Sequence, residues 1–321
     1  MRLSRERLTA EAEATGFRPE ALEKVIHLLN LLTVFQRHPA LGGRLALKGG
    51  TALNLFFFGL PRLSVDIELN YVGAAGREEM LADRDRVERA VQAVCQREEL
   101  SVTRVPSDHA GGKWRLRYGS ALGGSGNLEV ALNFMFRVPL WPVASMRSVD
   151  VGTYAASGIP VLDLHELAAG KLAALFARQA SRDVFDAYGL LTAAKLDPDR
   201  LRLSFILYGA MNRRDWRSIS LDDVGCDALE LENQLLPVLS RSVREALQPD
   251  WAVQMVEVCR ERLSGLVRFT PGEAEFLDRL LDHGEVVPSL LTDDTQMAAR
   301  ILAHPLLQWK ALNVQRHRES R

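Results

Sequence analysis

Two acidic residues stand two positions apart in a segment that otherwise reads as a buried β-strand, Val65-Asp66-Ile67-Glu68-Leu69. Side chains at i and i+2 project from the same face of a strand, so the two carboxylates are predicted to point one way and the apolar residues into a core. Like charges held side by side raise each other's pKa unless a cation lies between them. A divalent ion such as Mg²⁺ or Mn²⁺ that also binds substrate phosphates would satisfy both acids. The pattern also suits the solvated face of an edge strand.

A double glycine, Gly49-Gly50, precedes these acids and joins an apolar run at residues 45–47 to an apolar helix candidate at residues 51–58. The first N–H groups of a helix have no acceptor within the helix, and a glycine turn leading into a helix is therefore suited to bind phosphate. Gly-Gly is also common as a tight turn without a ligand. In this order, the turn and the acid pair predict a nucleotide site.

A third acid, Glu129, lies in a further strand candidate at residues 128–136. From a neighbouring strand this carboxylate could be aimed at Asp66 and Glu68, which would give three metal ligands suited to two-metal phosphoryl or nucleotidyl transfer. Because a glycine-rich turn, Gly123-Gly124-Ser125-Gly126, precedes it, Glu129 could equally be an acid at a strand end.

A lysine and an aspartate stand out in the second half of the chain, where Lys171 lies within an apolar stretch and Asp186 follows fifteen positions later. On one straight helix they would be separated by about 22 Å. Ser181 is a suitable N-cap, so a break near Ala180 would fold two helices back and bring the two side chains onto facing sides. Lys171 would then offset triphosphate charge, while Asp186 would position that lysine or accept the proton of an acceptor hydroxyl.

Two arginines, Arg178 and Arg182, flank this predicted break. Their planar guanidinium groups suit bidentate binding of further phosphates. The alternative is a structural helix hairpin with intrahelical salt bridges, for example between Arg182 and Asp186 at i,i+4.

Together these segments resemble the AbiEii/AbiGii-type nucleotidyltransferase toxins of bacterial toxin–antitoxin pairs, sometimes classed as type IV. The resemblance covers about residues 45–190 and is carried by motifs in the same order, namely Gly49-Gly50-Thr51, Arg62-Leu63-Ser64-Val65-Asp66-Ile67-Glu68, Lys171, Arg178 and Arg182-Asp183-Val184-Phe185-Asp186. The family has a polymerase-β-like nucleotidyltransferase domain joined to a helical domain.

The resemblance implies a role for each of these residues. The catalytic residues would be Asp66, Lys171 and Asp186, the nucleotide-binding residues Gly49, Gly50, Thr51, Arg62, Ser64, Arg178 and Arg182, and the metal ligands Asp66 and Glu68, to which our reading of the strands adds Glu129. The second acid is Glu68 where the family more often carries Asp, a difference that bears on metal geometry.

The resemblance also implies an NTP substrate, an RNA acceptor, and a cognate antitoxin encoded by the adjacent gene. Some members of the family transfer nucleotides onto the 3′ end of tRNA and thereby block translation. Two alternatives stay open: a nucleotidyltransferase that acts on a protein, and a catalytically silent module that binds nucleotide or RNA.

The elements that must position these residues indicate an α+β fold. Apolar patterning predicts strands at residues 45–47, 64–72, 113–118, 128–136 and 159–162, and helices at residues 20–37, 51–58 and 77–99. From His165 onward the period is mainly helical, with breaks near Pro198, Gly225, Pro249, Pro271 and Pro288. We therefore expect a nucleotidyltransferase domain at residues 1–160 and a mainly helical domain at residues 161–321, which would contribute Lys171 and Asp186 and bind the acceptor.

Composition limits the class of protein. The 321 residues include 40 basic and 41 acidic side chains, so attraction to a nucleic acid must come from a local patch. The basic tail from Trp309, with Lys310, Arg316, Arg318 and Arg321, could supply such contacts or be merely solvated. Three separated cysteines argue against disulfides, and no apolar run is long enough for a membrane span. A cytoplasmic setting is expected.

Overall fold

The computed structural model of the protein describes residues 3–105, 110–178 and 180–319. Its α-helices are α1 (Arg5–Thr15), α2 (Pro19–Arg37), α3 (Gly49–Ala52), α4 (Arg77–Arg97), α5 (Leu164–Arg178), α6 (Ser181–Thr192), α7 (Pro198–Ala210), α8 (Ala228–Glu230), α9 (Arg241–Ala246), α10 (Trp251–Leu263), α11 (Pro271–Asp278), α12 (Thr295–Ala303) and α13 (Pro305–Glu319). Its strands are β1 (Leu45–Lys48), β2 (Asp66–Tyr71), β3 (Ser101–Arg104), β4 (Gly111–Gly119), β5 (Ser125–Asn133), β6 (Ala144–Met146) and β7 (Ile159–Val161).

Short π- and 3₁₀-helices complete the described elements. The π-helices are η1 (Leu53–Phe57), η4 (Leu231–Leu235) and η6 (Arg279–His283), and the 3₁₀-helices are η2 (Trp216–Ser218), η3 (Leu221–Asp223), η5 (Leu236–Val238) and η7 (Pro288–Leu290). Since η1 follows α3 without a break, the helix predicted for residues 51–58 begins two residues earlier, at Gly49.

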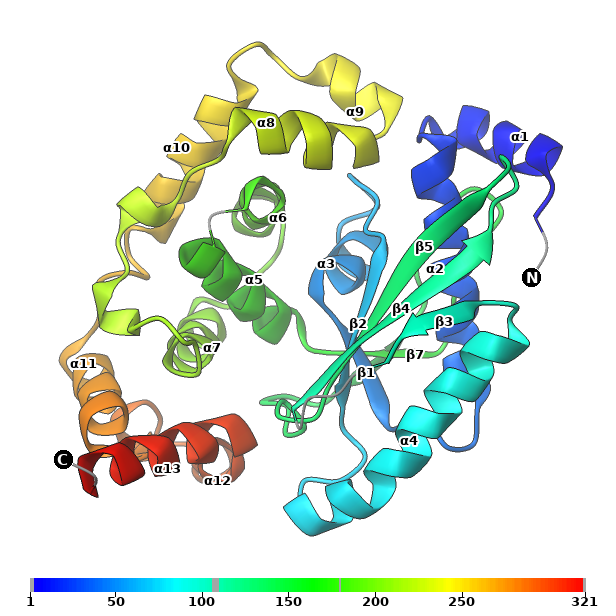
Figure 1. The fold of residues 1–321 in the computed structure, drawn as a ribbon. Coiled ribbons are helices and arrows are strands. Elements are labelled where there is room, and N and C mark those ends of the chain that lie inside the picture. Colours follow the sequence, from blue (N-terminus) through cyan, green and yellow to red (C-terminus); the bar gives the residue numbers. More distant parts are fainter. Residues whose placement is uncertain (1–2, 106–109, 179, 320–321) are drawn as a thin grey trace. The chain divides into compact units, whose positions relative to one another are not determined.

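The strands of the described segments form one mixed sheet in the order β3-β4-β5-β2-β1-β7-β6. The β2–β5 and β1–β7 pairs are parallel, whereas the other neighbours are antiparallel. This architecture, shown in Figure 1, confirms the predicted α+β class. The five predicted strands are present, whereas the short strands β3 and β6 were not predicted.

One face of the sheet carries the core beneath α2 and α4. On β4 the buried residues Trp114, Leu116 and Tyr118 alternate with exposed basic residues. Tyr118 packs against His27 of α2, with ring centroids 4.3 Å apart. Trp114 lines a cavity of about 250 Å³ together with side chains of α4. The basic residues of β4 therefore project from the opposite face of the sheet.

The chain forms two compact units that are discontinuous in sequence. The first, the sheet unit, comprises residues 1–137, 143–162 and 232–247, and the second, the helical unit, comprises residues 138–142, 163–231 and 248–321. Residues 138–142 thus belong to the helical unit although the chain on both sides belongs to the sheet unit. Residues 232–247 belong to the sheet unit although the chain on both sides belongs to the helical unit.

The helical unit is built around α5, which packs against α6 and α7. Its core includes three aromatic rings, those of Phe176, Phe205 and Trp216, with centroids 5.1 to 5.9 Å apart. Several of its helices begin at prolines where breaks were predicted, at Pro198, Pro271 and Pro288. Proline suits the first turn of a helix, where its missing N–H has no acceptor to lose.

The three cysteines are free, as predicted from their separation. In the part of the chain that the structure describes, none of the helices combines the length and the apolar character that crossing a membrane requires.

Candidate active site

The predicted acid pair lies on β2 in the sheet unit. Ile67 and Leu69 are buried, whereas Asp66 and Glu68 alternate with them on the polar face of the sheet. The strand begins at Asp66 itself, so the first acid lies at the point where the chain enters the sheet. This confirms the orientation predicted for the two carboxylates.

Glu129 lies beside Asp66, because the Cα atoms of the two residues are register partners in the parallel β2–β5 pair. Its carboxylate is held from the other side by β4. Lys113 Nζ lies 2.9 Å from Glu129 Oε2, and Arg115 Nε lies 3.0 Å from Oε1. The hydrogen bond from Lys113, with help from Arg115, keeps the pKa of Glu129 below its ordinary value. Any contact of Glu129 with a metal would compete with these two cations.

The double glycine begins α3, with Lys48 as the N-cap. Gly49 has a φ of +73°, in the left-handed region that favours glycine. A Cβ atom at this position would overlap Oε2 of Glu68 and lie 2.8 Å from its Cδ. Lys48 Nζ lies 3.5 Å from the same Oε2. The glycine therefore permits a close approach of the helix start to the second carboxylate.

The residues between the glycines and the acids fasten helix to strand. The Thr51 hydroxyl, 1% exposed, lies 3.0 Å from Ser64 Oγ and within hydrogen-bond distance of the carbonyl of Asp66. Arg62 is 3% exposed, and its Nη1 donates to the Leu63 carbonyl. Arg62 also forms a β-bridge with Leu239, from the returning segment 232–247. These contacts fix the chain that leads into Asp66.

In the helical unit, α5 and α6 fold back on each other as predicted. Lys171 Nζ of α5 lies 2.9 Å from Asp186 Oδ2 and 2.8 Å from Asp183 Oδ1, both on α6. Arg178 adds a second cation, with its Nε 2.6 Å from Asp183 Oδ2. Burial opposes ionisation of Asp183, but Lys171 and Arg178 outweigh it and hold the pKa of Asp183 below its ordinary value.

The sequence did not single out Asp183, the acid that joins both cations. The helical spacing of α6 could have identified it. Asp183 lies three, four and seven positions before Asp186, Ala187 and Leu190, and all four residues are on the buried side of the helix. A charged residue at such a position needs a partner when it is buried. Arg182, in contrast, is only half-buried.

The predicted N-cap at Ser181 is wrong. The helix begins at Ser181, with Ala180 as the N-cap. The Ser181 backbone N–H donates to Glu230 Oε2, and the Ser181 hydroxyl bonds the backbone of Asp227. A carboxylate distant in sequence therefore caps α6.

The acids of the sheet unit fit a hard divalent ion by their donor chemistry. Asp66 and Glu68 supply carboxylate oxygens from one face of one strand, and Mg²⁺ is commonly held by one or two carboxylates together with substrate phosphates. Within residues 3–105, 110–178 and 180–319, no group of three His, Cys, Asp or Glu side chains is placed to hold a metal by itself. The substrate phosphates would have to complete the coordination.

The mixed seven-stranded sheet with its helices fits the polymerase-β-like fold of nucleotidyltransferases. Comparison with protein-family models matches residues 33–268 to the family described as "Nucleotidyl transferase AbiEii toxin, Type IV TA system". This match covers well over half of the chain, and the chain therefore belongs to the AbiEii family of nucleotidyltransferase toxins. Membership implies an NTP substrate and an antitoxin partner.

Among solved structures, the fold is similar to that of MenT4, a nucleotidyltransferase toxin from Mycobacterium tuberculosis H37Rv. The TM-score is 0.63 at 17% sequence identity, and the likeness covers 94% of this chain and 99% of that chain. At this identity the likeness concerns the fold. A search of curated proteins found no match.

Proposed function

We propose that this toxin uses Mg²⁺ to transfer a nucleotide from an NTP onto an RNA acceptor, the 3′ end of tRNA, and that it acts in the cytoplasm by blocking translation. The observation that carries the proposal is the placement of Asp66 and Glu68 on one sheet face, with the Gly49 helix start packed against the second carboxylate. When bound, the metal would supply charge to the triphosphate and lower the barrier to substitution at phosphorus.

In the proposed reaction, the 3′ hydroxyl of the acceptor gives up its proton to solvent water, and its oxygen forms a bond to the α-phosphorus of the NTP. The bond from that phosphorus to the bridging oxygen breaks, and pyrophosphate leaves. Asp66 and Glu68 would hold the metal, and the amides of Gly49 and Gly50 would hold phosphate oxygens. Most of the rate would come from positioning and charge stabilisation.

We assign the ion-pair cluster of Lys171, Arg178, Asp183 and Asp186 to the same reaction. Lys171 would offset the negative charge of the triphosphate, with Asp186 as its positioning residue, because Asp186 is buried and bonded to Lys171. Arg178 has a largely exposed side chain and could bind phosphate while it retains Asp183. We also propose that Thr51, Arg62, Ser64 and Arg182 bind the nucleotide and that Glu129 is a further metal ligand. The motif positions of the first four residues and the place of Glu129 beside Asp66 support these roles.

The test is incubation of the protein with each labelled NTP in turn, Mg²⁺ and total tRNA. We expect label on RNA, lost on chelation and reduced roughly a hundredfold or more in Asp66→Asn, because removal of a metal ligand forfeits several kcal/mol. Asp85→Asn, which neutralises an exposed acid on α4, is the matched control and should retain activity.

Lys171→Met belongs in the same assay together with a measurement of thermal unfolding. Loss of the lysine leaves Asp183 and Asp186 buried without this cation, which costs about 3–5 kcal/mol when a buried pair is broken. Transfer should therefore be compared per folded molecule. Label on a protein instead of RNA would contradict the proposed acceptor, and RNA binding without transfer would indicate a silent module.

The antitoxin is the partner that family membership implies, and we propose that the adjacent gene encodes it. Expression of the toxin alone should arrest growth, and co-expression of that gene should restore it. Arrest that persists under co-expression would contradict this assignment.

A further inference from the structure

Four cations lie on the polar face of the sheet, beside the carboxylates. Lys113, Arg115 and Arg117 alternate with buried residues on β4, and Arg104 lies on the neighbouring edge strand β3. We call this set the basic stripe. Its side chains are exposed, with 59% exposure for Lys113 and 57% for Arg115.

The register of the strands connects this stripe to the acid pair in one row across the sheet. Arg104 is the partner of Arg115, Arg115 of Glu129, and Glu129 of Asp66. Register partners project from the same face, and adjacent strands are spaced by about 4.8 Å. The Cα atoms of Arg115 and Arg104 should therefore lie about 10 Å and about 14 Å from that of Asp66.

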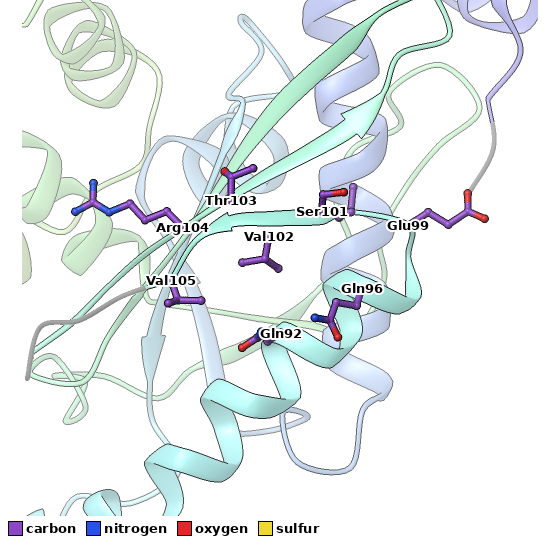
Figure 2. A pocket seen from close by; sticks show the side chains of 9 residues that line it. Gln92, Gln96, Glu99, Ser101, Val102, Thr103, Arg104 and Val105 are labelled. Atoms are coloured by element: carbon purple, nitrogen blue, oxygen red, sulfur yellow. The ribbon is translucent and has the colours of Figure 1, made fainter.

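The other side of the edge strand β3 faces α4 across a cavity. A cavity of about 460 Å³ separates β3 from α4, and Val102 and Val105 line it with Gln92 and Gln96 of the helix. Arg104 also borders this cavity, but Figure 2 shows its side chain extending away from α4. Arg104 is thus directed away from the helix that covers the core face.

The charge balance of this face favours a polyanion. On β3, β4 and β5, the described residues of this face carry four cations and one anion, Glu129, which Lys113 and Arg115 hold. The acid pair Asp66 and Glu68 lies beyond them on β2, where Lys48 contacts Glu68. Arg104 and Arg117 are exposed and make no side-chain ion pair among the residues that the structure describes. Since the whole chain has a formal net charge of −1, this is a local excess of positive charge.

We infer that the basic stripe binds the phosphate backbone of the acceptor RNA next to its reacting end. Successive cations on β4 are about 6.8 Å apart, a spacing of the same order as that of phosphates along an extended strand. The short distance to Asp66 selects phosphates near the reacting hydroxyl and not a remote part of a folded RNA. The inference rests on the proposed RNA acceptor.

The basic tail is a weaker candidate for this contact. Lys310 Nζ donates to the carbonyl of Asn212, and the nearest partner of Arg318 is His283. Lys310, which is half-buried, is therefore engaged within the helical unit, and the exposed Arg318 contacts the same unit. Arg321 lies outside the described residues.

The test uses the double variant Arg104→Gln/Arg117→Gln, which leaves both partners of Glu129 in place. The matched control is Arg89→Gln/Arg97→Gln, two exposed arginines of α4 on the other side of the sheet. The probes are a labelled short single-stranded RNA and total tRNA, with binding measured between about 50 and 200 mM salt. Affinity for the NTP and the KM and kcat of transfer to tRNA are measured in parallel.

We expect the stripe variant to bind RNA more weakly, with a salt slope shallower by about 1.4, since each phosphate contact on a single strand contributes about 0.7. Its KM for tRNA should rise several-fold, with kcat and NTP affinity unchanged. Thermal unfolding should match the wild type, because both side chains are exposed.

The outcomes separate this inference from the proposed function. If RNA is labelled but the stripe variant behaves like the α4 control, the inference is overturned and the function stands. A loss of NTP affinity instead of RNA affinity also overturns it, because the stripe would then serve the nucleotide. If the wild type labels no RNA but binds it with a salt slope that depends on Arg104 and Arg117, the inference holds and the proposed transfer fails.

Discussion

Gly49 combines two constraints at one residue, a left-handed backbone and a missing Cβ beside the Glu68 carboxylate. Gly49→Ala would therefore lose about 1–3 kcal/mol to backbone strain and would also displace the second acid. We expect transfer activity per folded molecule to fall at least about tenfold, because a misplaced metal ligand lowers the rate steeply. Labelled-NTP transfer and urea unfolding measure the two effects.

Gly43→Ala is the matched control for this variant. Gly43 has a φ of +71°, but a Cβ there would meet no atom within 4 Å. This substitution should lower the free energy of unfolding through backbone strain but leave the transfer activity per folded molecule unchanged. Equal activity losses in the two variants would show that the contact between Gly49 and Glu68 does not matter for the reaction.

At the scale of residues, sequence predicted the faces and neighbours of the acids but not the surroundings of the supporting side chains. The positions of Asp66 and Glu68 follow from alternation, and the placement of Glu129 beside Asp66 agrees with the strand-based prediction. Arg62 is predicted to bind the nucleotide, and this role stays a prediction. Its burial depends on Leu239, more than 170 positions away, which no local pattern reveals.

At the scale of elements, Glu166 of α5 fastens the short segment 138–142 into the helical unit. It is 3% exposed, and it accepts hydrogen bonds from the Trp141 backbone N–H and the Tyr208 hydroxyl. Arg300 of α12 holds the same segment through the carbonyls of Pro139 and Leu140. Burial raises the pKa of Glu166 from 4.5 to about 7.

This raised pKa makes stability depend on pH in a defined direction. The folded state binds a proton more tightly than the unfolded state, so the contribution of Glu166 is complete below 4.5 and is lost as the pH rises to about 7. The loss is on the order of 3 kcal/mol. Glu166→Gln should remove it, so urea unfolding of variant and wild type should diverge in the variant's favour across this window.

Glu257→Gln, at an exposed acid of α10, is the control and should run parallel to the wild type. If the curves of Glu166→Gln and wild type also stay parallel from pH 4.5 to 7, burial of the Glu166 carboxylate does not control the stability of this segment.

Sequence predicted the fold-back of α5 and α6 from Ser181 as an N-cap, since a break there would bring Lys171 and Asp186 together. The fold-back is present, although Ser181 is not the N-cap. Sequence misplaced the cap because Glu230, which caps α6, follows 49 positions later. It also did not predict β3, a four-residue edge strand with a register shift between Val102 and Arg104. Such a strand is too short and too exposed to show clear alternation.

At the scale of the whole molecule, sequence predicted an α+β part followed by helices, but not that segments are exchanged between the two compact units. The segment 232–247 returns to the sheet unit through specific contacts. The Leu63 N–H donates to the Val238 carbonyl at 2.8 Å, and the Arg241 N–H donates to the Gly16 carbonyl at 2.8 Å. Leu235 and Leu239 in this segment are fully buried. The spacing of apolar residues in the sequence predicts that such leucines are buried, but it does not show whether they pack in the sheet unit or in the helical unit.

The returning segment should therefore be required for the sheet unit to fold fully. A fragment of residues 1–162 would leave Arg62 and Leu63 uncovered, and each buried leucine of the missing segment is worth about 1.5–3 kcal/mol. A synthetic peptide of residues 232–247 should raise the unfolding temperature of that fragment in a concentration-dependent way, because it binds only the folded state. The same peptide with Leu239→Asp, which cannot bury that side chain, should have little effect. Identical melting with and without the peptide would mean that the fragment is stable without this segment.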